Sequence, residues 1–141
     1  MAGRSDPLAS LARLRCLETG AARRRVAEDT GRLLAAEDRA AAARVALRTE
    51  QGSGASADYA AWVGRGMAER DRAALGAAHA AERLAQGRAA LAEARVAERC
   101  IERLLLDRQA EARAQLLRKA QAGVDDAAGR KARVTARHGR G

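Results

Sequence analysis

The sequence predicts an all-α protein: a long antiparallel two-helix coiled-coil hairpin whose second helix is longer than the first. Three observations predict this fold. The chain of 141 residues contains 39 alanines but one proline, apolar residues recur every seven positions, and one cluster of helix-breaking residues divides the chain. Because alanine buries little surface and large aromatic side chains are scarce, a globular core is not expected. Helices that bury only a narrow seam fit this composition better.

The first helix is predicted over residues 7–50. Asp6 can accept a hydrogen bond from the first-turn amides, and Pro7 suits the first helical position because an N–H there has no helical partner. The apolar residues of this segment keep alternating spacings of three and four, which is typical of a coiled-coil seam. The two apolar rows are Val26, Leu33, Ala40 and Leu47, and Ala22, Ala36 and Ala43, with Asp29 as a polar interruption.

A turn is predicted at residues 51–57, where glycine and serine are concentrated. The second helix is expected to run from about 58 to 122, with Ser56 or Asp58 as its cap and Gly123 after its end. Its seven-residue spacing continues over six heptads, which again predicts a coiled-coil seam. The two rows are Val63, Ala77, Leu84, Leu91, Leu105 and Ala112, and Gly66, Ala73, Ala80, Gly87, Ala94 and Ile101, interrupted by Arg70, Glu98 and Arg108.

Folding about this turn would pair residues whose numbers add to about 108. Leu47 is then expected near Ala61, and Leu8 near Cys100. From there the second helix would continue alone for roughly 22 residues, about 33 Å at 1.5 Å per residue. An apolar helix without a partner is a candidate protein-binding surface, and the alternatives are self-association or a terminus that folds back. The candidate residues on this segment are Ile101, Leu104, Leu105, Leu106, Leu116 and Leu117.

A second candidate surface lies at the start of the second helix, where the largest local group of bulky apolar side chains is found. Tryptophan and tyrosine are the residues most enriched at binding hot spots. The structural alternative is that these side chains fasten the hairpin end by packing on Val45 and Leu47, and both roles are compatible. The four residues of this cluster are Tyr59, Trp62, Val63 and Met67.

No residue pattern predicts catalysis, a cofactor or a metal site. His79 and His138 have no nucleophile at a suitable spacing, and no pair of cysteines or histidines shows metal-ligand spacing. With the register above, Cys16 and Cys100 would be offset by about eight residues, or about 12 Å, which is beyond disulfide reach. The two thiols are therefore expected to be reduced. The chain is expected to be a non-enzymatic protein without a small-molecule substrate.

Basic residues outnumber acidic ones by 27 to 18, for a net charge of +9. The hairpin is expected to occupy residues 1–128, and residues 129–141 a basic flexible tail. The positive excess is spread evenly along the chain with both signs interleaved, as on a solvated helix surface. Aromatic side chains that could stack on single-stranded bases are nearly absent. Specific nucleic-acid binding is therefore not expected.

The first ten residues lack the apolar core of a signal peptide, and no stretch approaches 18 apolar residues. The protein is therefore expected in the cytoplasm, with any membrane contact peripheral.

Three stretches resemble the flagellar FliJ family. Residues 8–15, LASLARLR with Glu18 following, look like the N-terminal helix of that family, and residues 58–63, DYAAWV, are similar to the entry into its second helix. Residues 104–111, LLLDRQAE, followed by Lys119 and Val124-Asp125-Asp126, look like its C-terminal part. The resemblance covers residues 8–128, and the break at Gly123-Val124 departs from the family pattern.

The resemblance implies a stalk or adaptor of the flagellar type III export apparatus. Members of the family form a two-helix coiled coil, insert into the hexameric export ATPase, and contact the export gate and the export chaperones. The leucine-rich end of the second helix would then meet the ATPase ring and the aromatic cluster the export gate. The protein would be peripherally associated with the inner membrane through these partners. The alternatives are a coiled-coil scaffold or tether of another assembly and, less favoured, a basic helical nucleic-acid binder.

Overall fold

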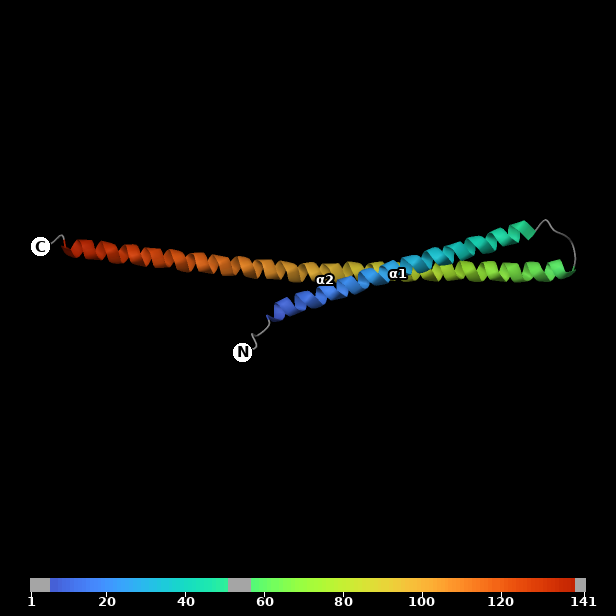
Figure 1. The fold of residues 1–141 in the computed structure, drawn as a ribbon, viewed down its shortest axis with the longest axis horizontal. Helices are drawn as coiled ribbons and strands as arrows, with labels where there is room; N and C mark the ends of the chain where they lie inside the picture. The colour runs from blue at the N-terminus through green and yellow to red at the C-terminus, as the bar shows by residue number, and fades with distance from the viewer. Residues whose placement is uncertain (1–5, 51–56, 139–141) are drawn as a thin grey trace. The chain divides into compact units, whose positions relative to one another are not determined.

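The computed structural model describes residues 6–50 and 57–138, which form two helices. Helix α1 spans Pro7–Glu50 (44 residues) and helix α2 spans Ala57–His138 (82 residues). Figure 1 shows α1 from blue to blue-green and α2 from green to red, running in opposite directions. The predicted all-α antiparallel hairpin with a longer second helix is confirmed. The predicted turn and its cap residue Ser56 lie outside the described residues, apart from Ala57, which is already helical.

Helix α1 begins as predicted. The Asp6 Oδ1 atom accepts a hydrogen bond from the Leu8 backbone N–H at 3.1 Å, and the Asp6 carbonyl accepts one from the Ser10 N–H at 3.0 Å. The aspartate therefore satisfies a first-turn donor that has no partner within the helix. Pro7 follows as the first helical residue.

The predicted end of the second helix near Ala122 is wrong, because α2 continues through Gly123 and Gly129 to His138. A glycine inside a helix costs only about 1 kcal/mol relative to alanine, and it ends a helix when it adopts a left-handed conformation. Both glycines keep a helical backbone here. The described part of the predicted flexible tail, residues 129–138, is thus helical, and residues 139–141 lie outside the described part.

The described residues divide into two units. Unit 1 contains the residues up to Leu11 and those from Arg99 onward, and unit 2 contains Ala12–Glu98. In unit 2 the buried and half-buried side chains alternate with spacings of three and four on both helices, as predicted for a coiled-coil seam. The buried positions of this seam are Thr19, Asp29, Ala40, Leu47, Ala80, Leu84, Gly87 and Leu91.

The register of unit 2 differs from the predicted one. Leu47 faces Gly66 rather than Ala61, because a Cβ atom on Gly66 would lie 3.0 Å from the Leu47 Cδ2 atom. Val26 likewise faces Gly87, where a Cβ atom would lie 3.6 Å from the Val26 Cγ2 atom. Facing residues therefore have numbers that add to 113 instead of about 108. Since few residues of α1 follow Leu47 whereas nine residues of α2 precede Gly66, α2 begins beyond the end of α1 (Figure 1).

The shifted register extends to unit 1. The predicted neighbour of Leu8 was Cys100, but an ion pair of 3.0 Å joins Asp6 to Arg108, well beyond that cysteine. Helix α1 thus accompanies α2 for about one and a half turns more than predicted. Because the predicted offset between Cys16 and Cys100 depended on the wrong register, it no longer holds.

Candidate partner-binding surfaces

The aromatic cluster at the start of α2 is built on a stacked pair. The rings of Tyr59 and Trp62 have centroids 6.2 Å apart and planes inclined by 19°. Both side chains are half-buried, as is Val63, whereas Met67 is exposed. Residues three apart on a helix share a face, so the pair presents one continuous aromatic surface.

The same cluster also packs on α1, in part as the structural alternative expects. The site where Gly66 would carry a Cβ atom is 3.0 Å from Leu47 and 4.0 Å from the Trp62 Cη2 atom, so both side chains lie close to the glycine. Leu47 is buried, whereas Val45 is 59% exposed and takes little part. Trp62 therefore lies in the neighbourhood of Leu47 beside Gly66. Partner binding by Tyr59, Trp62, Val63 and Met67 stays a prediction.

The leucine-rich segment of α2 falls into two parts. Ile101 and Leu105, which continue the seam spacing, are half-buried in unit 1, where α1 reaches Arg108. The prediction that they lack a partner within the chain is wrong, because the register extends α1 past them. Leu104 and Leu106 point away from the seam and are exposed.

From Gln109 to Ala128 the helix is solvated on every side. The described side chains of residues 109–128 are all exposed, with Leu116 at 67% and Leu117 at 72%. Val124 is also exposed and was not among the predicted residues, because it follows the expected helix end. Leu116 and Leu117 are therefore accessible to a partner protein. That they bind one stays a prediction.

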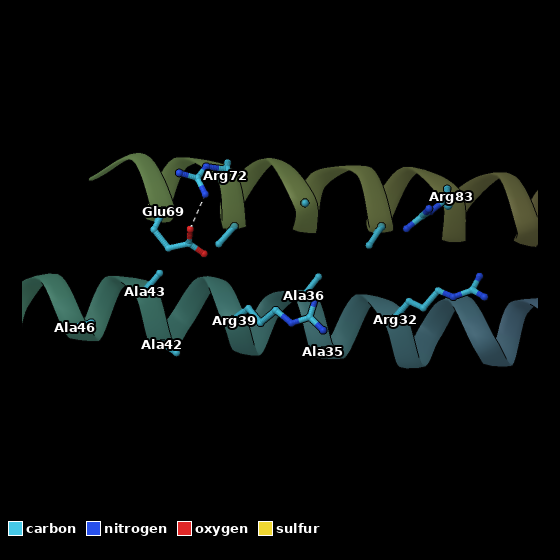
Figure 2. Close-up of a pocket in the computed structure, with 13 residues that line it drawn as sticks. Arg32, Ala35, Ala36, Arg39, Ala42, Ala43, Ala46, Glu69, Arg72 and Arg83 are labelled. Carbon is cyan, nitrogen blue, oxygen red and sulfur yellow. Dashed lines mark hydrogen bonds and ion pairs between the residues drawn. The ribbon is translucent and has the colours of Figure 1, made fainter. Parts of the chain in front are cut away.

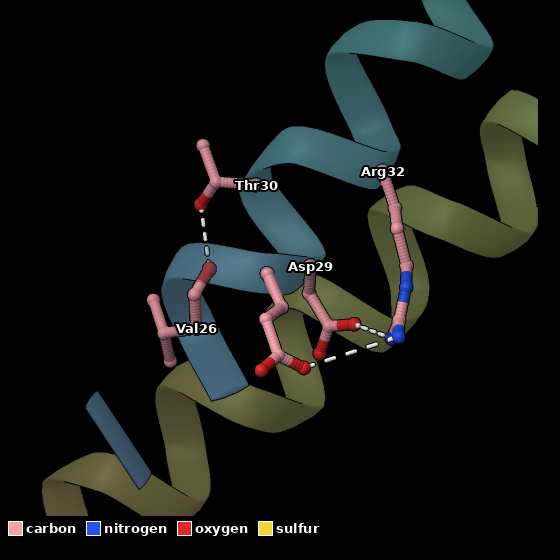
Figure 3. A network of polar contacts seen from close by, with 5 residues as sticks. Val26, Asp29, Thr30 and Arg32 are labelled. Atoms are coloured by element: carbon pink, nitrogen blue, oxygen red, sulfur yellow. Dashed lines mark hydrogen bonds and ion pairs between the residues drawn. The ribbon is translucent and has the colours of Figure 1, made fainter. Parts of the chain in front are cut away.

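A polar interruption lies within the seam of unit 2. Asp29 is 6% exposed, and its Oδ1 atom accepts a hydrogen bond from Arg32 Nη1 at 2.9 Å (Figure 3). Its Oδ2 atom lies over Gly87, where a Cβ atom would be 3.5 Å away. Thr30 donates to the Val26 carbonyl at 2.7 Å on the same turn. The carboxylate is thus held within its own helix over a residue without a side chain.

Thr19 is a seam residue that sequence reasoning missed. It is 1% exposed, and its hydroxyl has no hydrogen-bond partner among the described residues. The alternating spacing leads back from Val26 through Ala22 to this threonine, so the seam pattern could have found it.

A groove of about 770 Å³ runs along one side of the seam in unit 2 (Figure 2). Its surface is formed mainly by small residues from both helices, and arginines stand among them. The small residues are Ala35, Ala36, Ala42, Ala43 and Ala46 of α1 and Ala73, Gly76 and Ala80 of α2. The charged residues are Arg32, Arg39, Arg72, Arg83 and Glu69.

The part of the chain that the structure describes contains no group of three or more His, Cys, Asp or Glu side chains placed to hold a metal ion. His79 is exposed, and Cys16 and Cys100 are exposed free thiols. Neither described helix has a segment long and apolar enough to cross a membrane. Comparison of the chain with family models, with curated proteins and with solved structures finds no match.

Proposed function

We propose that this chain is a non-enzymatic coiled-coil adaptor that binds other proteins, and that it serves the flagellar type III export apparatus. In this role it binds the hexameric export ATPase and couples it to the export gate and export chaperones. Protein binding is supported by the exposed apolar side chains of α2 beyond Arg108. The flagellar setting is supported by the resemblance at residues 8–15, 58–63 and 104–111 alone.

The segment of α2 after Arg108 is the proposed ATPase-binding surface. Leu116 and Leu117 stand on a helix that no other described element covers, and each leaves about two thirds or more of its surface in water. Burying a leucine contributes about 1.5–3 kcal/mol, so a partner that covers both gains substantially. Amphipathic helices that bind in this way insert their apolar side chains into a groove of the partner.

The aromatic pair is the proposed contact with the export gate. Tyr59 and Trp62 combine a large apolar surface with polar atoms at their edges, which suits interfaces. Replacing Trp62 by alanine is expected to weaken gate binding while helical circular dichroism remains. Because Trp62 also lies near Leu47, Met67→Ala serves as a second variant at the more exposed member of the cluster.

The ATPase contact is tested by capture of purified export ATPase on the immobilised full chain. The variant Leu116→Arg/Leu117→Arg and a chain that ends after Gln109 are expected to lose capture. The matched control is Gln109→Arg/Gln115→Arg, which adds the same charge at exposed polar positions of the same segment. This control is expected to retain capture at about 0.15 M salt.

Two outcomes would contradict different parts of the proposal. If the unaltered chain captures no export ATPase, the flagellar assignment fails. If the leucine variant captures as well as the control, the assignment of this surface fails. The alternative function is a coiled-coil scaffold of another assembly, with which the seam of unit 2 is equally compatible. Mass spectrometry of the proteins that the chain captures from motile cells then distinguishes the two functions.

A further inference from the structure

The alanine-lined groove of unit 2 is a helix-sized surface. On α1 its lining runs from Arg32 to Ala46, and on α2 from Glu69 to Arg83. Each stretch covers 14 residue steps, about 21 Å of helix at 1.5 Å per residue. Since the two helices are antiparallel, Arg32 and Arg83 stand at one end of the groove and Ala46 and Glu69 at the other. Figure 2 shows Ala36 and Ala43 pointing from α1 toward α2.

Small side chains make the groove able to receive larger ones. In a two-helix coiled coil the positions beside the seam normally carry long side chains that cover it. Here the residues beside the seam on this side include Ala35, Ala42, Ala46 and Gly76, all of them exposed. A third helix with leucine or isoleucine side chains would therefore find space to pack against both helices at once.

The charges around the groove determine which kind of helix fits. Arg39 and Arg83 make no ion pair within the part of the chain that the structure describes. Arg32 pairs with Asp29 and Glu28 of its own helix, and Arg72 pairs with Glu69 of its own helix. Arg39 and Arg83 therefore leave two positive charges beside the groove for a partner's carboxylates, and opposite charges beside a seam are what set partner choice in coiled coils.

Segments of this chain do not meet these requirements. The undescribed internal segment 51–56 has six residues, fewer than the 14 residue steps of the groove. The C-terminal part of α2, residues 109–138, carries seven basic and three acidic side chains, so a second copy would bring positive charge to a positive groove.

We infer that this groove binds an acidic amphipathic helix of another protein, one that places large apolar side chains on the alanines and carboxylates beside Arg39 and Arg83. The bound state is a local three-helix bundle over about four turns of α1 and α2. This surface belongs to unit 2, whereas the leucines of the proposed ATPase contact belong to unit 1, so the two assignments are tested independently.

The test uses the full chain and a fluorescein-labelled synthetic peptide of about 21 residues, three heptads with leucine at the core positions and glutamate beside them. Fluorescence anisotropy at about 0.15 M salt measures its affinity. Arg39→Glu/Arg83→Glu is expected to weaken binding by about tenfold or more. The control Arg44→Glu/Arg88→Glu makes the same charge change on exposed positions of the same helices outside the groove, and is expected to stay within about threefold.

A second pair of variants separates shape from charge. Ala42→Arg fills the groove and adds positive charge, whereas Ala41→Arg adds the same charge at an exposed position that does not line it. Docking in the groove predicts that Ala42→Arg weakens peptide binding and that Ala41→Arg does not. All four variants keep helix-forming residues, so circular dichroism is expected to be unchanged.

Several results would overturn this inference. Absence of peptide binding at about 100 μM would do so, a concentration that corresponds to roughly 5 kcal/mol of binding free energy. Equal affinities of Ala42→Arg and Ala41→Arg would show that charge alone attracts the peptide. A change of sedimentation coefficient in Arg39→Glu/Arg83→Glu without peptide would identify a second copy as the occupant. Loss of retention on DNA or on anionic vesicles in that variant, with peptide binding intact, would identify those ligands instead.

Discussion

The Asp6 carboxylate joins the beginning of α1 to the middle of α2. Its Oδ1 atom accepts hydrogen bonds from both the Leu8 backbone N–H, at 3.1 Å, and the Arg108 Nη1 atom, at 3.0 Å. One oxygen thus caps α1 and also joins its beginning to Arg108 of α2. Because it has two roles, the consequences of removing it and of removing its partner differ.

Replacing Asp6 by alanine is expected to loosen the first turns of α1 more than replacing Arg108. The loss of an N-cap costs about 1 kcal/mol, whereas an ion pair between side chains as exposed as these contributes little. Amide hydrogen exchange in the first two turns of α1 should accelerate about fivefold in Asp6→Ala and less than about twofold in Arg108→Ala. Equal acceleration in the two variants would show that the ion pair, not the cap, holds this end.

Leu84 is expected to be the most costly apolar residue of the seam to truncate. It is 4% exposed, and the seam residues next to it on its own helix, Ala80 and Gly87, are too small to fill the space it would leave. Leu84→Ala should lower the free energy of unfolding by about 2–3 kcal/mol. Leu75→Ala, on the exposed side of the same helix, should change it by less than about 0.5 kcal/mol. Urea unfolding followed by circular dichroism measures both, and similar values would contradict the seam assignment.

Two glycines should respond to added side chains in opposite ways. A Cβ atom on Gly31 meets nothing within 4 Å, so Gly31→Ala should stabilise the chain by about 0.5–1 kcal/mol through its helix propensity. At Gly66 the space is filled by Leu47, so Gly66→Val should destabilise by about 1–3 kcal/mol. Thermal unfolding midpoints of the two variants should therefore move in opposite directions from the unaltered chain.

Replacing Asp29 by leucine should stabilise the hairpin. The carboxylate is buried, its partner Arg32 is exposed enough to stay hydrated alone, and Gly87 leaves room for an apolar side chain. Exchanging a buried charge for an apolar residue of similar size is often worth about 1 kcal/mol or more. An unfolding midpoint in urea below that of the unaltered chain would show that the aspartate contributes to the seam instead of weakening it.

The seam could be predicted from the sequence because its spacing is local information. Val26, Leu33 and Leu47 define a stripe on one helix whatever that stripe faces. The cap at Asp6 is likewise determined by its immediate neighbours. These features agree with the structure for that reason.

The register could not be predicted, because it depends on the fit between two distant stripes. In a seam of alanine and glycine, several alignments oppose small residues with small residues. Here Leu47 is accommodated by Gly66, and Asp6 reaches Arg108. Counting back from the turn detects neither contact, so it predicts Ile101 and Leu105 beyond the end of α1.

The groove was missed for the same reason. Ala35 and Ala42 are unremarkable as single exposed residues of an alanine-rich helix. They form a groove only together with Ala73 and Gly76 of α2, and the register decides that meeting. The sequence does not reveal the positive charge of the groove either. Arg39 and Arg83 are 44 positions apart, and only the register brings them to the same groove.

The solvated part of α2 beyond Arg108 should also govern how proteases attack the chain. In residues 109–128 every side chain is exposed, so a backbone opening there disrupts no packed core. Only the helix itself resists cleavage, and a single helix is marginally stable. Arg113, Arg118 and Lys119 offer trypsin sites there. Limited digestion should therefore trim α2 back toward Arg108 before it cuts within the seam of unit 2. A partner seated on Leu116 and Leu117 would slow that trimming, so the rate of proteolysis reports occupancy of this end without any label.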